Sequence, residues 1–320
     1  MREVDEFLVV DRVSKRYKLP GGRDVMAVRD VSFTQAKGET LGIVGESGCG
    51  KSTLAQLILN LVPPTSGEVR FRGARLAALK PAALRRMRRD MQMIFQDPRS
   101  SLDPRMRVGR LLEEPLVIHR VGTVDERRAR VEELLALVGL PAEATRSFPH
   151  EFSGGQRQRI AIARAIALSP ALIVADEPVS SLDVSIQAQI LNLLIELRHR
   201  LGLTYVFISH DLAVVRHLAD TVAVMYLGEI VEHVAAERLF EAPAHPYTRS
   251  LLAAVPEVGG KHASARDVVE SETGSAEARP SGCAFHPRCP VAQPRCRSEP
   301  PPLIATGAEQ NHRVRCWLYG

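Results

Sequence analysis

An eight-residue stretch of this chain, Gly45-Glu46-Ser47-Gly48-Cys49-Gly50-Lys51-Ser52, has the residue types and spacing that bind phosphate. It fits the pattern G-x-x-x-x-G-K-[ST], follows the apolar run 41–44 and precedes a helical pattern from Thr53 to Leu61. Its glycines let backbone N–H groups turn inward around phosphate oxygens, and the helix N-terminus adds partial positive charge. We expect Lys51 to reach the β- and γ-phosphates of a nucleotide and Ser52 to offer its hydroxyl to Mg²⁺. The alternative, an ordinary glycine-rich turn, is disfavoured by the strand–loop–helix context.

Further polar residues follow strand patterns, where ligands bind in an α/β sheet. Asp176 and Glu177 end the apolar run 171–175, so Asp176 can hold Mg²⁺ through water and Glu177 can orient or deprotonate the attacking water. Gln96 follows the strand pattern 91–95 and could touch Mg²⁺ or that water, while His210 could hydrogen-bond a γ-phosphate. Taken alone, Gln96 is more typical of a turn and His210 of a structural position.

A second anion site is predicted at Ser153-Gly154-Gly155-Gln156, just before the amphipathic run 157–168. Ser153 is a good N-cap, and exposed amides at a helix start favour an anion. Since one triphosphate cannot obviously occupy two anion sites on one small domain, this second site is expected to serve a nucleotide held by another chain. Tyr17 could stack on an adenine ring, or could equally be a packing residue.

The composition is that of a soluble globular protein. The chain has 320 residues, 45% hydrophobic and 25% charged, with a formal net charge of +5. The acidic N-terminus lacks a signal-peptide layout, which favours a cytosolic chain, and no apolar run approaches the ~20 residues of a membrane helix. The arginines at 85, 86, 88 and 89 could contact nucleic acid, but without interleaved aromatic residues they are more typical of a solvated helix face.

The order of patterns predicts an α/β fold with an added tail. Strands are expected in 1–44 around a turn at 20–22, then a strand at 68–71, a helix at 81–89 and an α-helical insertion of about 97–165. A long helix at 186–200 is expected to end at Gly202, followed by two short strands within 221–234 and a helix that ends near Pro243. We expect a nucleotide-binding domain over 1–256, a linker over 257–282 and a proline- and cysteine-rich tail over 283–320.

Four of the five cysteines, Cys283, Cys289, Cys296 and Cys316, lie in that tail. Disulfides are not expected in a cytosolic chain, and structural zinc usually has paired C-x₂₋₄-C knuckles, which are absent. Four thiolates without a tight knuckle suit an iron–sulfur cluster, whose larger size relaxes the spacing. The spacing alone leaves three alternatives open: an iron–sulfur cluster, zinc and no metal.

Together these motifs resemble the ATP-binding subunits of ABC transporters over roughly residues 5–250. The order of phosphate loop, Gln96, the 153–156 signature, Asp176-Glu177, Ser181-Leu182-Asp183 and His210 carries the resemblance; Phe152 stands where leucine is widespread. It implies a P-loop NTPase core of ABC type with an N-terminal antiparallel β part, a helical insertion and a small cysteine-rich tail. It also implies a head-to-tail dimer with ATP and Mg²⁺ held between two chains.

The resemblance assigns a role to each motif. Glu177, His210 and Lys51 would be catalytic, and Mg²⁺ would be held by Ser52, Gln96 and Asp176. The nucleotide would contact two groups of residues: Tyr17, Gly45, Ser47, Gly48, Cys49, Gly50, Lys51, Ser52, Thr53, Gln96 and Asp176 of one chain, and Ser153, Gly154, Gly155, Gln156 and Asp183 of the other.

A finer resemblance points to the dipeptide/oligopeptide importer branch and its F-type ATPase subunit. The branch is indicated by Gln96-Asp97-Pro98 with Ser101-Leu102, by 185–189, by His245-Pro246-Tyr247-Thr248 and by the tail from Cys283 to Pro290, and the F-type subunit by Lys51-Ser52-Thr53 with Arg105-Met106. It implies a peripheral subunit on the cytoplasmic face of the cell membrane, a D-type ATPase partner, two permease subunits, an extracytoplasmic binding protein and no nucleic acid. In this branch such a tail is associated with a [4Fe-4S] cluster.

Three alternatives remain at this stage. Nickel and glutathione importers share the branch pattern. An ABC-type ATPase of nucleic-acid metabolism would account for the arginine cluster, although no second ATPase half or coiled-coil insertion is visible. A regulatory protein whose tail senses redox state is the third.

Overall fold

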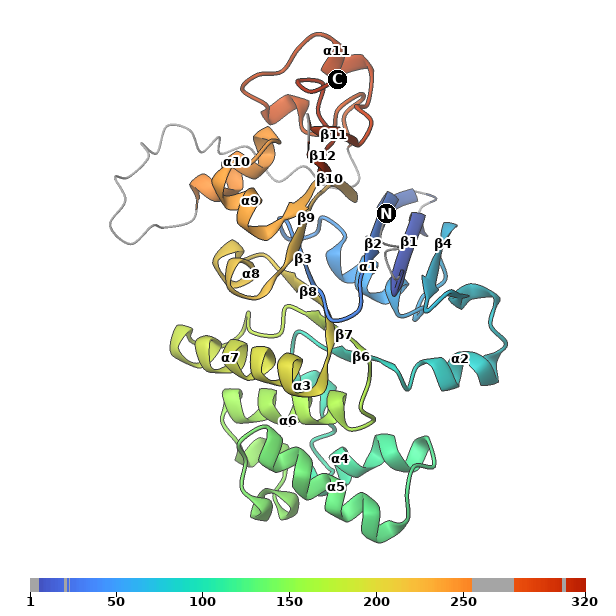
Figure 1. Ribbon diagram of the computed structural model, residues 1–320, viewed down its shortest axis with the longest axis vertical. Helices are drawn as coiled ribbons and strands as arrows, with labels where there is room; N and C mark the ends of the chain where they lie inside the picture. The colour runs from blue at the N-terminus through green and yellow to red at the C-terminus, as the bar shows by residue number, and fades with distance from the viewer. Residues whose placement is uncertain (1–5, 20–21, 23, 255–278, 307–308) are drawn as a thin grey trace. The chain divides into compact units, whose positions relative to one another are not determined.

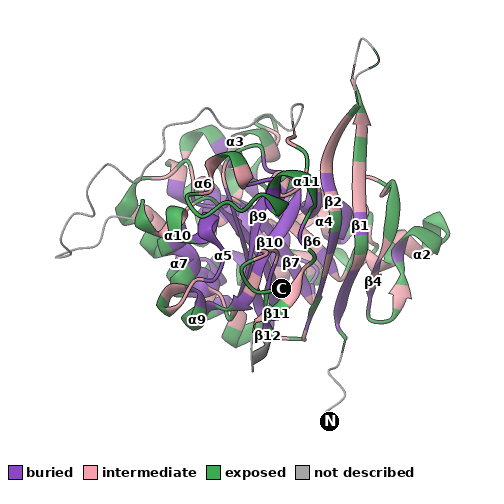
Figure 2. Cartoon of the chain, turned by 90° about the horizontal axis from the view of Figure 1, so that it is seen from above, coloured by how far each residue is buried: buried purple, intermediate pink, exposed green. Residues whose placement is uncertain are grey.

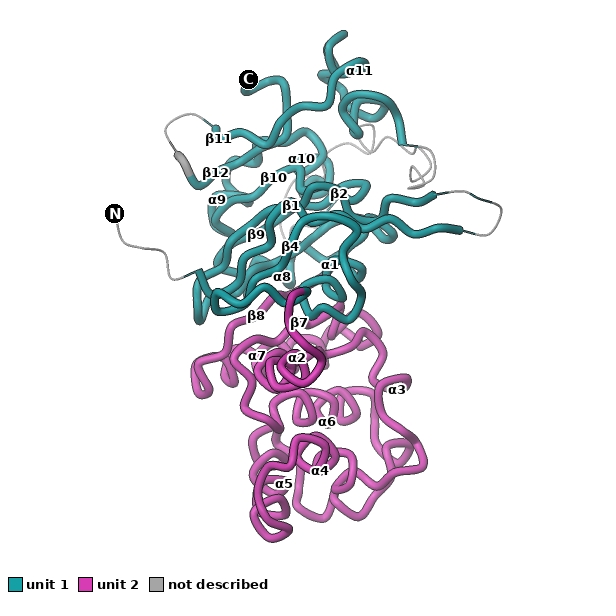
Figure 3. Tube along the Cα trace, turned by 90° about the vertical axis from the view of Figure 1, so that its right-hand side faces the viewer, with its two compact units in different colours: residues 1–77, 209–320 teal, residues 78–208 magenta. Residues whose placement is uncertain are grey.

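A computed structural model describes residues 6–19, 22, 24–254, 279–306 and 309–320 (Figure 1). The chain divides into two compact units, one of residues 1–77 with 209–320 and the other of residues 78–208 (Figure 3). The predicted linker at 257–282 lies outside the described residues except for 279–282, and of the predicted turn at 20–22 only Gly22 is described.

The first unit begins with an antiparallel sheet of order β2-β1-β4-β5, as the N-terminal patterns predict. Strand β1 (Leu8–Lys18) pairs with β2 (Asp24–Gln35) and with β4 (Ser66–Phe71), which pairs with β5 (Ala74–Arg75). Its buried face includes Phe7 and Phe71, whose rings meet edge to face with centroids 5.0 Å apart. Such aromatic burial is a large part of what holds a small sheet in place.

The second sheet of this unit carries the phosphate-loop motif. Its strands are ordered β11-β12-β10-β9-β3. The bounds are β3 (Thr40–Val44), β9 (Thr221–Tyr226), β10 (Glu229–Ala235), β11 (Ile304–Thr306) and β12 (Glu309–Val314). All five residues of β3 are buried, as is typical of a central parallel strand, and β9 lies parallel to it; Figure 2 shows the burial of β9 and β10.

The helices of the first unit flank these strands in sequence. They are α1 (Lys51–Ile58), α8 (Leu212–Leu218), α9 (Ala236–Glu241), α10 (Pro246–Ala253) and α11 (Arg295–Ser298). Helix α1 ends before the predicted Leu61 because Asn60 adopts a left-handed φ of 49°, and the Leu61 N–H donates to the Gln56 carbonyl at 2.8 Å. This is a Schellman closure, in which a left-handed residue satisfies the last carbonyls of a helix.

The second unit contains three parallel strands and the helical insertion. Strands β6 (Met91–Ile94), β7 (Leu172–Asp176) and β8 (Thr204–Ser209) pair in the order β8-β7-β6. The helices are α2 (Pro81–Met87), α3 (Pro98–Ser101), α4 (Val108–Ile118), α5 (Val124–Leu137), α6 (Gly154–Ile166) and α7 (Val184–Leu201). Helix α7 ends at Gly202 with a left-handed φ of 64°, as predicted.

Several elements of the first unit are absent from the sequence-based predictions: strand β5, helices α8, α10 and α11, and the tail strands β11 and β12. Strand β12 pairs with β10, with Glu232 opposite Val314 and His233 opposite Arg313. The tail therefore adds strands to the same sheet that carries β3 and β9, and its fold depends on that sheet.

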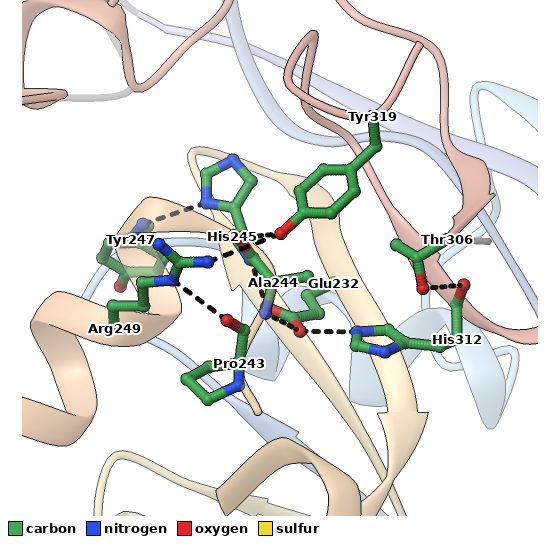
Figure 4. A network of polar contacts seen from close by, with 9 residues as sticks. All are labelled: Glu232, Pro243, Ala244, His245, Tyr247, Arg249, Thr306, His312 and Tyr319. Atoms are coloured by element: carbon green, nitrogen blue, oxygen red, sulfur yellow. Dashed lines mark hydrogen bonds and ion pairs between the residues drawn. The ribbon is translucent and has the colours of Figure 1, made fainter. Parts of the chain in front are cut away.

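A buried carboxylate fixes the tail and helix α10 (Figure 4). Glu232 is fully buried, with its oxygens accepting from the backbone N–H groups of Ala244 at 2.7 Å and His245 at 2.8 Å. His312 of β12 is also buried and places its Nε2 2.7 Å from Glu232 Oε1. Because a buried carboxylate is costly unless it is bonded, these three contacts specify one arrangement of the elements.

Removal of the His312 ring should therefore destabilise the first unit. We expect His312→Ala to lower the free energy of unfolding by about 3 kcal/mol, since a buried charge loses its partner. Urea unfolding followed by circular dichroism measures this. The matched control is His217→Ala, an exposed histidine on α8, for which a change below about 0.5 kcal/mol is expected. Equal effects of the two variants would contradict a structural role for the Glu232 contact.

Candidate functional site

The phosphate loop lies between β3 and α1, and its glycines are required by close backbone contacts. Gly50 has a φ of 106°, and a Cβ on it would lie 2.1 Å from the Ala27 carbonyl oxygen. A Cβ on Gly45 would lie 2.2 Å from the carbonyl oxygen of Met225 on β9. Any larger residue at either position would push the loop away from the strands, so the two glycines let the loop pass close to its neighbouring backbone.

Lys51 opens helix α1 and turns back over the loop. Its side chain is buried, with Nζ donating to the carbonyl oxygens of Gly45 at 2.8 Å and Glu46 at 3.0 Å. The N-cap is Gly50, so no side chain caps this helix start. Burial raises the pKa of the neighbouring Cys49 thiol, which keeps it neutral beside the lysine. The loop thus places one ammonium group and a helix N-terminus together, which is suited to an anion.

Two residues that the sequence analysis did not assign to the site hold Glu46, the second residue of the loop. The Tyr247 hydroxyl of α10 accepts from the Glu46 N–H at 3.0 Å. The guanidinium of Arg288 in the tail makes two bonds of 3.0 Å to the two oxygens of the Glu46 carboxylate. Both residues lie within the stretches that carry the finer family resemblance, but only the fold shows that they contact the loop.

In the second unit, the predicted acidic residues end strand β7. Asp176 is buried as the last strand residue, and Glu177 follows with a left-handed φ of 45°. The backbone of Glu177 is fixed, since its N–H donates to the Ile208 carbonyl of β8 at 3.0 Å. Gln96 follows β6 and donates through Nε2 to Glu177 Oε2 at 3.2 Å. The structure therefore brings Gln96, Asp176 and Glu177 to one end of the parallel strands.

The signature at 153–156 forms the start of α6, as predicted. The Ser153 hydroxyl accepts from the Gln156 N–H at 3.3 Å, and the Gln156 side-chain oxygen accepts from the Ser153 N–H at 2.9 Å. This reciprocal pair is a capping box. A Cβ on Gly155 would lie 2.6 Å from the side chain of Ile186 on α7, so the glycine lets the two helices approach closely.

The remaining predicted residues lie at element ends or in the antiparallel sheet. Asp183 caps α7, accepting from the Ile186 N–H at 3.0 Å, and the Ser185 hydroxyl bond lowers the pKa of its carboxyl. His210 follows β8 and is exposed. Tyr17 lies in β1, where the Lys15 ammonium is 5.2 Å from its ring centroid. The assignment of all these residues to a nucleotide site stays a prediction.

The iron–sulfur prediction for the tail is wrong. Among the described residues, which include all four tail cysteines, the structure holds no group of three or more His, Cys, Asp or Glu side chains placed to hold a metal. The cysteines do line one cavity, together with Phe285, Trp317 and other apolar side chains. Burial raises the pKa of the Cys283 thiol to about 11 and also raises the pKa values of the Cys289 and Cys316 thiols.

The arginine cluster lies on and just after the short helix α2, whose residues are all at least partly exposed. Arg85 donates to the Ile118 carbonyl at 2.7 Å, which ties the end of α4 to α2. This contact gives Arg85 a structural role. In the described part of the chain, no helix is long and apolar enough to cross a membrane.

Comparisons with known proteins agree with these motifs. Residues 28–180 match the ABC transporter family, and residues 231–296 match the oligopeptide/dipeptide transporter C-terminal region. A probable peptide ABC transporter ATP-binding protein of Sinorhizobium fredii is 51% identical, covering 94% of this chain and 87% of its own. The oligopeptide transport ATP-binding protein AppF of Bacillus subtilis is 50% identical, covering 92% of this chain and 90% of its own.

A solved structure supports the same relationship. The ATP-binding cassette MJ0796, a dimer in a post-hydrolysis state bound to ADP and Pi, is 33% identical with a TM-score of 0.66 and covers 72% of this chain and 98% of its own. The ABC ATPase fold and the ATPase activity that the motifs predict are thereby confirmed. The chain belongs to the ATP-binding subunits of ABC transporters, within the group that carries the oligopeptide/dipeptide transporter C-terminal region.

Proposed function

We propose that this ATPase powers the import of dipeptides or oligopeptides through a separate membrane permease. The observation that supports this most is the phosphate loop, which places the Lys51 ammonium at the N-terminus of α1, in a chain whose relatives are named for peptide transport. The C-terminal region matched at 231–296 favours peptides over the nickel or glutathione alternatives. Nothing in the comparisons favours a protein of nucleic-acid metabolism.

The loop residues fit the triphosphate of ATP. Gly48 has open space where a Cβ would stand, Gly45 and Gly50 let the loop pass close to its neighbouring backbone, and Lys51 supplies the positive charge that the β- and γ-phosphates require. Ser47, Cys49 and Thr53 would contribute backbone or hydroxyl donors beside them. Mg²⁺, when bound, neutralises charge that develops on the phosphates, and Ser52, Gln96 and Asp176 are the residues that we assign to it.

Glu177 is the proposed general base. Its side chain is oriented by Gln96 and its backbone by Ile208, so the carboxylate can align and deprotonate water. His210 would hydrogen-bond the γ-phosphate. Tyr17 would stack on the adenine ring.

The second anion site is proposed to complete the nucleotide site of another chain. In the capping box at Ser153, the helix start is ordered before any ligand binds, which favours an anion. Gly154, Gly155, Gln156 and Asp183 would complete this surface. The dimeric state of MJ0796 with ADP and Pi supports this arrangement, and we propose a related D-type ATPase as the partner.

The membrane parts of the transporter are proposed to be other chains. Two permease subunits and an extracytoplasmic binding protein would select the peptide, while this subunit would lie peripherally on the cytoplasmic face. Closure of the ATPase pair on ATP and its reopening after hydrolysis would drive the permease.

Replacement of the proposed base tests the mechanism. Glu177→Gln keeps the size of the side chain but removes the carboxylate, so we expect unchanged ATP affinity and a turnover lower by about 10²- to 10⁴-fold. Fluorescent-nucleotide binding and phosphate release measure the two quantities. Glu143→Gln, at an exposed glutamate of the same unit, is the matched control and should retain turnover. Near-normal turnover of Glu177→Gln would assign the base to another residue.

Uptake by cells tests the cargo. In cells of the organism that encodes this chain, we expect deletion of its gene to abolish uptake of a labelled tripeptide, the wild-type protein to restore it and Glu177→Gln not to restore it. Labelled nickel and glutathione are measured in the same cells. Loss of nickel or glutathione uptake with normal tripeptide uptake would contradict the peptide assignment while leaving the ATPase intact.

A further inference from the structure

The tail and the phosphate loop meet at one ion pair. Arg288 Nη1 lies 3.0 Å from Glu46 Oε2, and Nη2 lies 3.0 Å from Oε1. This is the parallel two-bond geometry in which a guanidinium binds a carboxylate best. The side chains are only 19% and 26% exposed, so solvent screens the pair less than it screens a surface ion pair.

Aromatic rings fix the guanidinium in that position. Arg288 lies over the rings of Tyr226 and Phe285, with its central carbon 5.9 Å and 5.8 Å from their centroids. These rings meet edge to face at 5.3 Å, and Tyr247 packs against both. The bond to Glu46 raises the pKa of Arg288, so the guanidinium stays charged. The two rings therefore restrain the Arg288 guanidinium in the position from which it binds Glu46.

The tail that carries Arg288 is itself anchored. His312 of β12 contacts the buried Glu232, and the Tyr319 hydroxyl donates to the Ala244 carbonyl at 3.2 Å (Figure 4). Within the tail, the Cys283 N–H donates to the Cys296 carbonyl at 2.8 Å. The segment that carries Arg288 is thus attached to the same sheet as the loop.

Glu46 connects this ion pair to Lys51, the lysine of the loop. Its carbonyl accepts from Lys51 Nζ at 3.0 Å and from the Cys49 N–H at 3.3 Å, while its own N–H is bonded to Tyr247. A shift of Glu46 would therefore move the backbone that positions Lys51. In addition, an uncompensated carboxylate in the loop would repel a triphosphate, and Arg288 neutralises it.

We propose that Arg288 is a positioning residue for the phosphate loop, through which the C-terminal region sets the affinity of this subunit for ATP. This inference rests on the proposed role of the loop in ATP binding. Arg288 does not contact the nucleotide in this account: it acts through Glu46, by neutralising the carboxylate and fixing the backbone beside Lys51.

The test is a double-mutant cycle on the full chain, with KM for ATP, kcat and the Kd of a fluorescent ATP analogue as readouts. We expect Arg288→Gln to raise KM and Kd by about 5- to 20-fold with kcat within about 2-fold, because an ion pair of this geometry is lost beside a binding anion. Glu46→Gln in the Arg288→Gln background should recover most of the affinity, since no carboxylate then needs neutralising. A purely structural role for Arg288 would give no such rescue.

The matched control is Arg295→Gln. Arg295 lies in the same tail, over the Trp317 ring and paired with Glu299, and its side chain is 51% exposed. We expect the KM of Arg295→Gln for ATP to lie within about 2-fold of the wild-type value. Equal KM values for Arg288→Gln and Arg295→Gln would overturn the inference, as would the absence of rescue by Glu46→Gln.

Two further variants separate the possible failures. Lys51→Ala should weaken ATP binding whether or not Arg288 matters; if it binds ATP normally, the proposed role of the loop fails. If Lys51→Ala binds ATP weakly while Arg288→Gln binds it with wild-type affinity, only the inference about the tail fails. Should Arg288→Gln not fold, Arg288→Lys keeps the charge without the two parallel bonds, and an unchanged KM for ATP in that variant would overturn the part of the inference in which Arg288 fixes the backbone beside Lys51.

Discussion

The structure of the first unit depends on the close approach of the phosphate loop to its neighbouring strands. Gly50 passes the Ala27 carbonyl and Gly45 passes the Met225 carbonyl at distances that exclude a Cβ. This constraint sets the path of the backbone between β3 and α1, and that path in turn places the Lys51 ammonium over the loop. A loop restrained in this way is ready for phosphate before the nucleotide arrives, so less ordering accompanies binding.

Two carboxylates near the proposed chemistry, those of Glu177 and Glu46, are oriented by neighbours in their own units. Gln96 orients Glu177, and Arg288 and Tyr247 hold Glu46. This matters because phosphoryl transfer is catalysed mainly by positioning and electrostatics, with little covalent chemistry for the protein to perform. The tail enters this scheme through strand β12, which extends the sheet that carries the loop. In this account, the C-terminal region is part of the nucleotide-binding machinery.

Local patterns predicted much of the fold and of the candidate site, whereas non-local contacts did not show in the sequence. The loop glycines, the Ser153 capping box and the left-handed Gly202 each follow from the chemistry of a few adjacent residues. The pairing of β12 with β10 and the bond between Arg288 and Glu46 join residues that are far apart in the chain, which periodicity cannot reveal. The iron–sulfur prediction for the tail cysteines failed for a related reason: their spacing permits a cluster, but spacing does not fix the directions of the side chains.

The central claim is that this ATPase works as one subunit of a membrane importer. The most direct measurement is affinity purification of the tagged protein from detergent-solubilised native membranes, followed by mass spectrometry of the proteins that remain bound. We expect two polytopic permease subunits and a second ATPase of the same family among them. Recovery only from the soluble fraction, with nucleic acid or ribosomes attached, would contradict it.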